Sequence, residues 1–251
     1  MKLLRFGFIA MLLLMSASLC FGDIYMKQKN HTDGFQMMGQ GRPEENNINE
    51  VWITDAGVCT QNDNMTMMML SQEQKMVMIN HQEKSYVEMP MDIGKILSQA
   101  TEGGDAEETA QLHNMMGNMM KMEVTVTPSS ETKTIREWKC KKYTVTIQTF
   151  MGPITQTIWA TEDIQLDKDL YQKFSMAMFS AMPGMQKSLG DIMKKMEQVK
   201  GVQVETESTQ TMMGTTITSK TELLEYKTGT APQGLFKIPA GYTKKSMPMG
   251  M

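Results

Sequence analysis

The chain has 251 residues and a formal net charge of −3, with 25 basic and 28 acidic side chains spread along it. This length suits one domain. The lack of a clustered basic segment argues against binding to nucleic acid. Methionine is the unusual residue, with 31 copies, several-fold above ordinary usage.

The first 22 residues have the order of a secretory signal peptide. Lys2 and Arg5 precede an apolar run from Phe6 to Met15, and small residues then lead to Gly22. The run of about ten residues is too short to cross a bilayer of about 30 Å as a helix. We therefore expect cleavage after Gly22 and a periplasmic or secreted mature chain without a transmembrane segment. A lipid anchor at Cys20 is the alternative.

Period-two spacing of apolar residues predicts strands in the next part of the chain. The first strand covers residues 24–29, and a polar loop follows from Gly39 to Asn49. Turns about ten residues apart then separate short apolar segments, as in a meander. These segments are Val51 to Cys59, Met65 to Leu70, Met76 to Ile79 and Ser85 to Met89.

Two stretches have helical spacing instead. The first insertion runs from Asp92 to Met120, and the second runs from Asp169 to Val199 with a break at Pro183 and Gly184. Strands are expected between and after them. They are Met122 to Thr127, Lys139 to Thr149, Thr155 to Thr161, Val202 to Thr211, Thr215 to Tyr226 and Gly234 to Ile238.

This order of elements predicts an α+β domain over residues 23–243, followed by a methionine-rich tail over residues 244–251. An antiparallel sheet with both helical insertions gathered on one face would bury the apolar side of each element.

Four short segments resemble a family of exported bacterial proteins of unknown function related to the LolA/LolB-like fold. That resemblance implies a strongly curved antiparallel sheet, an incomplete β-barrel, whose concave face is covered by the helices. Relatives with this architecture carry acyl chains or lipoproteins, or bind lipids in the cell envelope. The segments are Lys84 to Tyr86, Glu137 to Val145, Thr157 to Ile164 and Leu235 to Tyr242.

Two cysteines, Cys59 and Cys140, remain after cleavage of the signal. An oxidising compartment would allow one disulfide between them, closing a long loop. The alternative is a pair of small buried apolar side chains, because neither cysteine has a second ligand at metal-binding spacing.

No motif in the sequence predicts catalysis. Phosphate loops, nucleophile elbows and zinc-protease motifs are absent from it. The three histidines, His31, His81 and His113, are far apart in sequence and are expected to be surface or loop residues. We therefore predict that the protein is not an enzyme.

The methionines allow two interpretations. In the strands, alternation places Met65, Met67 and Met69 on one face, and it pairs Met76 with Met78 in the same way. Such residues could simply replace leucine in the core, or line a concavity that adapts to varied apolar ligands.

The second interpretation is capture of Cu(I), for which thioethers are suitable soft ligands. His113, Met116 and Met120 have the spacing of one helix face. The tail adds three methionines next to Pro and Gly, where a core role is hard to assign. These tail residues are Met247, Met249 and Met251.

Three functions follow from the sequence. The favoured one is an exported binding protein that holds a lipophilic small molecule or acyl chain in an apolar cavity under helices. The first alternative is a protein that binds Cu(I) or another soft metal through clustered methionines. The second is a structural or interaction protein of the cell envelope with a protein partner.

Overall fold

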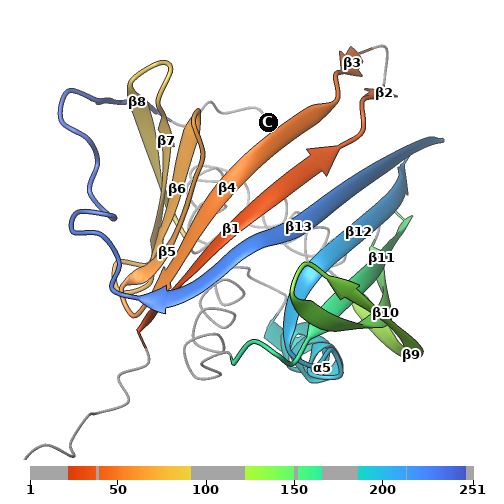
Figure 1. Ribbon diagram of the computed structural model, residues 1–251. Coiled ribbons are helices and arrows are strands. Elements are labelled where there is room, and N and C mark those ends of the chain that lie inside the picture. The colour runs from red at the N-terminus through yellow and green to blue at the C-terminus, as the bar shows by residue number, and fades with distance from the viewer. Residues whose placement is uncertain are drawn as a thin grey trace, which may run out of the picture.

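The computed structural model describes residues 22–37, 40–91, 122–149, 152–165, 186–212 and 214–246. In these ranges twelve strands form one large mixed sheet (Figure 1). The strands are β1 (Asp23–Thr32), β4 (Glu45–Thr54), β5 (Gly57–Gln61), β6 (Met65–Leu70), β7 (Lys75–Asn80), β8 (Ser85–Pro90), β9 (Glu123–Ile135), β10 (Trp138–Thr149), β11 (Gly152–Thr161), β12 (Val202–Met212), β13 (Thr215–Gly229) and β14 (Thr243–Lys244).

The sheet is organised around β1 and β13, which pair with each other near its middle. The strand order is β14-β8-β7-β6-β5-β4-β1-β13-β12-β11-β10-β9. All pairs are antiparallel except β14 with β8. Figure 1 shows β4 to β8 on one side of the β1–β13 pair and β9 to β12 on the other. We call these sets of strands the first half and the second half.

One helix, α5 (Gln186–Met196), is present in the part of the chain that the structure describes. It packs on the second half through Ile192, which joins a buried cluster with Val145 and Ile158. Met196 lies one turn further along and contacts the same cluster. Lys194 and Lys195 lie in the last turn, where positive charge suits the helix dipole.

The C-terminal segment covers one face of the first half. Leu235, Phe236, Ile238 and Tyr242 pack against the core cluster that contains Cys59, and we call residues 235–245 the strap. The strap ends in β14, which adds to the outer edge of β8. Its amides at positions 243 and 245 donate to the carbonyl oxygens of residues 84 and 86, at 2.9 and 2.8 Å.

A separate hairpin joins β1 to β4. It consists of β2 (Phe35–Met37) and β3 (Gln40–Arg42), which form a two-stranded sheet. The Thr215 hydroxyl at the start of β13 donates to the carbonyl oxygen of Gln36 at 2.9 Å, which holds the hairpin against the main sheet.

The predicted fold class was wrong. The described residues form a mostly β structure with one short helix, and the sheet is neither closed nor strongly curled, so it is not the incomplete barrel that the resemblance implied. The first helical insertion, Asp92 to Met120, lies outside the described residues. The second is described only from Gln186, where α5 confirms its last part.

Most predicted strands are confirmed, with corrections. The segment from Val51 to Cys59 is divided between β4 and β5, because residues 55 and 56 form a turn. The expected loop from Gly39 to Asn49 contains β3 and the first five residues of β4, because its polar chain pairs with the polar end of β1. The segment from Gly234 to Ile238 is a series of turns instead of a strand. Its apolar residues pack as part of the strap.

Candidate functional site

Two rows of uncharged side chains cross six strands of the sheet, from β1 through β4 to β8. Residues directly opposite each other on neighbouring strands share a face of the sheet. The first row is Ile24, Ile53, Val58, Met69, Met76 and Met89. The second row, two residues along each strand, is Met26, Val51, Thr60, Met67, Met78 and Val87.

The methionines concentrate at one end of these rows. In the first row, β1, β4 and β5 contribute isoleucine and valine, whereas β6, β7 and β8 contribute only methionine. We call this end the methionine face. Its members are Met67, Met69, Met76, Met78 and Met89.

Tight turns set the register that brings these residues together. Gln74 ends the β6–β7 turn and Lys84 ends the β7–β8 turn, and both have a φ of 48°. This left-handed conformation is uncommon for residues other than glycine and closes hairpin loops. Because a slip of one residue would move every methionine to the other face, the turns decide the composition of the methionine face.

Burial decreases along the first row toward the methionines. Ile24, Ile53 and Val58 are at most 3% exposed, and Met69 is 8% exposed. Met76 and Met89 are half-buried. In the second row, Met67 and Met78 are also half-buried. The methionine face therefore continues the core but is accessible at the end near β8.

The charged groups of the same strands point to the opposite face. On β8, Glu88 alternates with Met89 and forms ion pairs with Lys75 at 3.2 Å and with Lys244 of β14. The hydrogen bonds from Lys244 and Lys75 lower the pKa of the Glu88 carboxyl below its ordinary value. Neither row contains a titratable side chain, so the methionine face offers thioether and alkyl groups without a fixed charge.

The opposite face is covered by the strap and has one buried polar network. His81 Nδ1 lies 2.9 Å from the Tyr242 hydroxyl, and His81 Nε2 lies 2.8 Å from the Thr66 hydroxyl. Both ring nitrogens therefore have partners, which favours a structural role for His81 over one as a catalytic base. The network attaches the strap to the sheet.

His31 lies at the other end of the first half, close to the hairpin. Its Nδ1 is 3.0 Å from Asn46 Oδ1, and its Nε2 is 2.9 Å from Asp33 Oδ1. These hydrogen bonds, with Asn46 first and Asp33 second, raise the pKa of the imidazole. In the described ranges no group of three or more His, Cys, Asp or Glu side chains has the arrangement of a metal site.

The sequence left Cys59 and Cys140 open between a disulfide and two buried thiols, and both are free thiols in the structure. Cys59 on β5 belongs to the cluster under the strap, whereas Cys140 on β10 belongs to a cluster of the second half. Six strand spacings separate β5 from β10, or roughly 29 Å along the sheet. Burial raises the pKa of the Cys59 thiol to about 11, so this residue has the character of a small apolar side chain.

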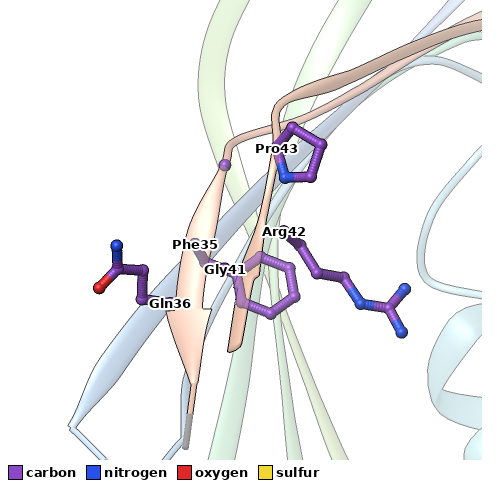
Figure 2. A pocket seen from close by; sticks show the side chains of 6 residues that line it. Phe35, Gln36, Gly41, Arg42 and Pro43 are labelled. Carbon is purple, nitrogen blue, oxygen red and sulfur yellow. The ribbon is translucent and has the colours of Figure 1, made fainter. Parts of the chain in front are cut away.

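Two open hollows occur among the described residues. One, of about 520 Å³, lies at the β2–β3 hairpin, where Figure 2 shows Phe35 and Arg42 on one side and Gln36 on the other. The other, of about 820 Å³, lies between α5 and β9 and mixes apolar residues such as Ile192 with charged ones such as Lys195. Neither is the enclosed apolar cavity expected from the sequence.

The predicted metal ligands all fall outside the described residues. They are His113, Met116, Met120, Met247, Met249 and Met251. The methionines that the sequence placed in strands lie within the described residues. Met67 shares a face with Met69, and Met76 shares a face with Met78, as the alternation predicted. Sequence reasoning missed that these pairs are neighbours across β6 and β7, because strand register is not visible in the spacing of one segment.

Comparison with curated proteins found no match. A family model described as a domain of unknown function (DUF4412) matches residues 44–242, from just before β4 to a point within the strap, before β14. The matched range includes all of the methionine face and most of the sheet. No relation to the LolA fold is shown. The chain belongs to the DUF4412 family.

Proposed function

We propose that this chain is an exported, non-enzymatic binding protein that holds a lipophilic ligand against the methionine face. The observation that supports the proposal is the pair of uncharged rows, in which half-buried methionines continue a fully buried aliphatic core. We place the ligand on a sheet face that the described residues leave partly exposed, because the described strands do not form the half-barrel on which the earlier expectation depended.

The chemistry of methionine suits such a ligand. Its unbranched side chain has three rotatable bonds and adapts to apolar surfaces of different shape. Each methylene group that a ligand removes from water contributes about 0.8 kcal/mol. The three methionines of the first row carry neither a charge nor a strong hydrogen-bonding group. We therefore expect the methionine face to select ligands by their apolar surface area.

The exported location is the second part of the proposal. It is supported by the order of Lys2, Arg5 and the apolar run from Phe6 to Met15. Fractionation of expressing cells and N-terminal sequencing of the mature protein test it. We expect a mature chain that begins at Asp23. A full-length chain in the cytosol would contradict this part of the proposal.

Ligand binding is tested on protein purified from the exported fraction. We expect native mass spectrometry to detect a bound lipid, and a fluorescent long-chain fatty acid to bind the delipidated protein. Changing Met78 and Met89 to glutamine, which is polar and of similar length, should weaken binding of the probe. Met193→Gln is the matched control, since Met193 is a half-buried methionine on α5 in the second half.

Two results would refute lipophilic binding. One is purified protein that contains no lipid, together with a fatty-acid probe that does not bind. The other is a probe that binds equally well to the Met78→Gln, Met89→Gln double variant and to the Met193→Gln control. Circular dichroism and a urea midpoint for each variant show whether it is folded.

A further inference from the structure

We propose that the methionine face also contains a binding site for a soft monovalent metal ion, Cu(I) or Ag(I), with Met69, Met76 and Met89 as its thioether ligands. The inference goes beyond lipophilic binding, because it assigns a coordination role to the sulfur atoms that apolar contact does not need. It also concerns residues other than those that the sequence suggested for copper.

The register places the three residues side by side. Met69 pairs with Met76, and Met76 pairs with Met89, so they lie on three consecutive strands in one row. Side chains opposite each other in such rows have Cβ atoms about 4.5 to 5.5 Å apart. For a metal–sulfur bond of about 2.3 Å, the length known for zinc and cysteine, three sulfurs around one ion lie about 4 Å apart. Met69 and Met89 lie on strands two spacings apart, or about 10 Å, so both flexible side chains have to turn toward Met76 for the three sulfurs to meet.

Further thioethers border the row, and Met91 packs in the same buried cluster as Met69 and Met76. Met67 and Met78 pair with each other in the second row, and each lies two residues from a ligand on the same strand. At about 3.4 Å per residue, this places them about 7 Å from Met69 and Met76 along the strands. They could supply a fourth ligand or a second position for the ion.

The local distribution of methionine supports a site over simple core packing. If methionine only replaced leucine, it should appear along the whole first row. Instead, β1, β4 and β5 use isoleucine and valine at positions no more than 3% exposed, and methionine occupies the row from Met69, which is 8% exposed, to the half-buried Met76 and Met89. A leucine would fill the same space, but only a thioether can bind a soft metal ion.

The surroundings determine which ion fits. Neither row contains a carboxylate or imidazole, so hard divalent cations have no suitable oxygen ligand there. Thioethers are neutral and bind Cu(I) and Ag(I) without losing a proton. Binding should therefore depend little on pH, in contrast to a site built from histidine or cysteine. The half-buried Met76 and Met89 leave an approach for the ion.

The test is anaerobic titration of the full-length mature protein with Cu(I) against a chromogenic Cu(I) chelator, and with Ag(I) alone. The key variant changes Met69, Met76 and Met89 to leucine, which keeps the face apolar. The first control changes Met68, which is on β6 but faces the strap, to leucine. The second control changes Met116, Met120, Met247, Met249 and Met251 to leucine.

We expect the key variant to lose one equivalent of tightly bound ion, or to bind it at least about tenfold more weakly. Both controls should keep that equivalent, and X-ray absorption of the Cu(I) protein should show sulfur ligands. Equal binding by the key variant and the unmodified protein would overturn the metal site, as would loss of the equivalent only in the second control. The fatty-acid probe should still bind the key variant, so failure of the metal site and failure of lipophilic binding give different results.

Discussion

The two halves of the sheet use their surfaces differently. In the first half, one face is covered by the strap and the other carries the uncharged rows. By contrast, a row of paired residues that runs from β10 in the second half to the central pair of β13 and β1 is mostly charged. Its members are Lys142, Trp159, Glu205, Glu222 and Lys29.

The charged row is held by ion pairs and ring contacts. Glu205 lies 2.7 Å from Lys133 and 2.9 Å from Lys220, and its side chain is only 14% exposed. Lys133 Nζ also lies 4.3 Å from the centre of the Trp159 ring. These groups satisfy one another, so the second half keeps a polar surface that needs no ligand.

This contrast is the reason for proposing a ligand site on the first half. Both faces of β6 are apolar, as expected for its sequence MTMMML, whereas β10 alternates buried and exposed residues in the manner of a strand with one face in water. The strap covers one apolar face of β6, and the methionine face is the other. The four predictions below test whether the two halves are stabilised in the different ways that the structure shows.

The largest loss of stability is expected from a substitution at a completely buried position of the first row. Ile53→Ala should lower the free energy of unfolding by about 2 to 5 kcal/mol, because it removes apolar contacts and leaves a cavity. Ile48→Ala on the same strand should change it by about 0.5 kcal/mol or less, since Ile48 is 43% exposed. Urea denaturation measures both. Equal losses would show that the row is not the core of the first half.

The next largest loss of stability is expected from replacing a glycine in the second half. Gly201 has a φ of 85°, and a Cβ atom there would lie 1.8 Å from the carbonyl oxygen of Thr161. Gly201→Ala should cost about 2 to 4 kcal/mol, because strand β12 must move away from β11. Gly229→Ala, where a Cβ meets open space, is the control. A small loss at Gly201 would mean that the β11–β12 connection is loosely packed.

The ion pairs of the second half should give a smaller, pH-dependent effect. Burial alone would raise the pKa of Glu205, but the hydrogen bonds from Lys133 and Lys220 outweigh it, and the pKa is lowered from its ordinary value of 4.5. The stabilisation is therefore complete above about pH 4.5 and is lost as the pH falls through the lower, folded-state pKa.

Glu205→Gln should accordingly reduce stability by about 1 to 2 kcal/mol at pH 7, with a difference from the unmodified protein that shrinks in acid. The exposed pair of Lys141 and Glu162 is the control, and Lys141→Ala should leave the urea midpoint unchanged. A Glu205→Gln effect that stays constant down to pH 3 would show that charge is not the cause.

The smallest loss of stability is expected from weakening the attachment of the strap to the sheet. Tyr242→Phe removes the hydroxyl that lies 2.9 Å from His81 Nδ1, and it should cost about 0.5 to 1.5 kcal/mol. A double-mutant cycle with His81→Gln isolates the contribution of this contact. A coupling energy of zero would mean that apolar packing alone holds the strap in place.

Local pattern was enough to predict most strands and the last part of the helical region, but not the shape of the sheet. Alternation in β6 and β7 identified residues that share a face, and the apolar positions Ile192 and Met196 belong to a helix as expected. Curvature depends on how many strands add to the sheet and on its bulges, such as the one between Lys141 and Tyr143. Neither is encoded in the spacing of one segment.

The other differences between the predicted and the observed elements lie in a polar strand and in an apolar segment that forms turns. The second part of β9, from Ser129 to Ile135, is polar and was not expected to be a strand, yet it pairs along β10. The apolar residues Leu235 and Phe236 suggested a strand, but their burial comes from packing on the sheet as a turn-rich strap. The sequence predicted which methionines of one strand share a face. The rows across strands could not be predicted, because they depend on the register that the turns at Gln74 and Lys84 impose.

The short strand β14 has a protective consequence for the protein as a whole. An uncovered outer strand such as β8 would offer free amide and carbonyl groups to any passing chain, and its apolar neighbours would favour fibre-like self-association. Two residues of parallel pairing, with ion pairs from Lys244 and Lys245, are enough to obstruct that growth. The first two residues of β8 are thus blocked against the addition of another strand.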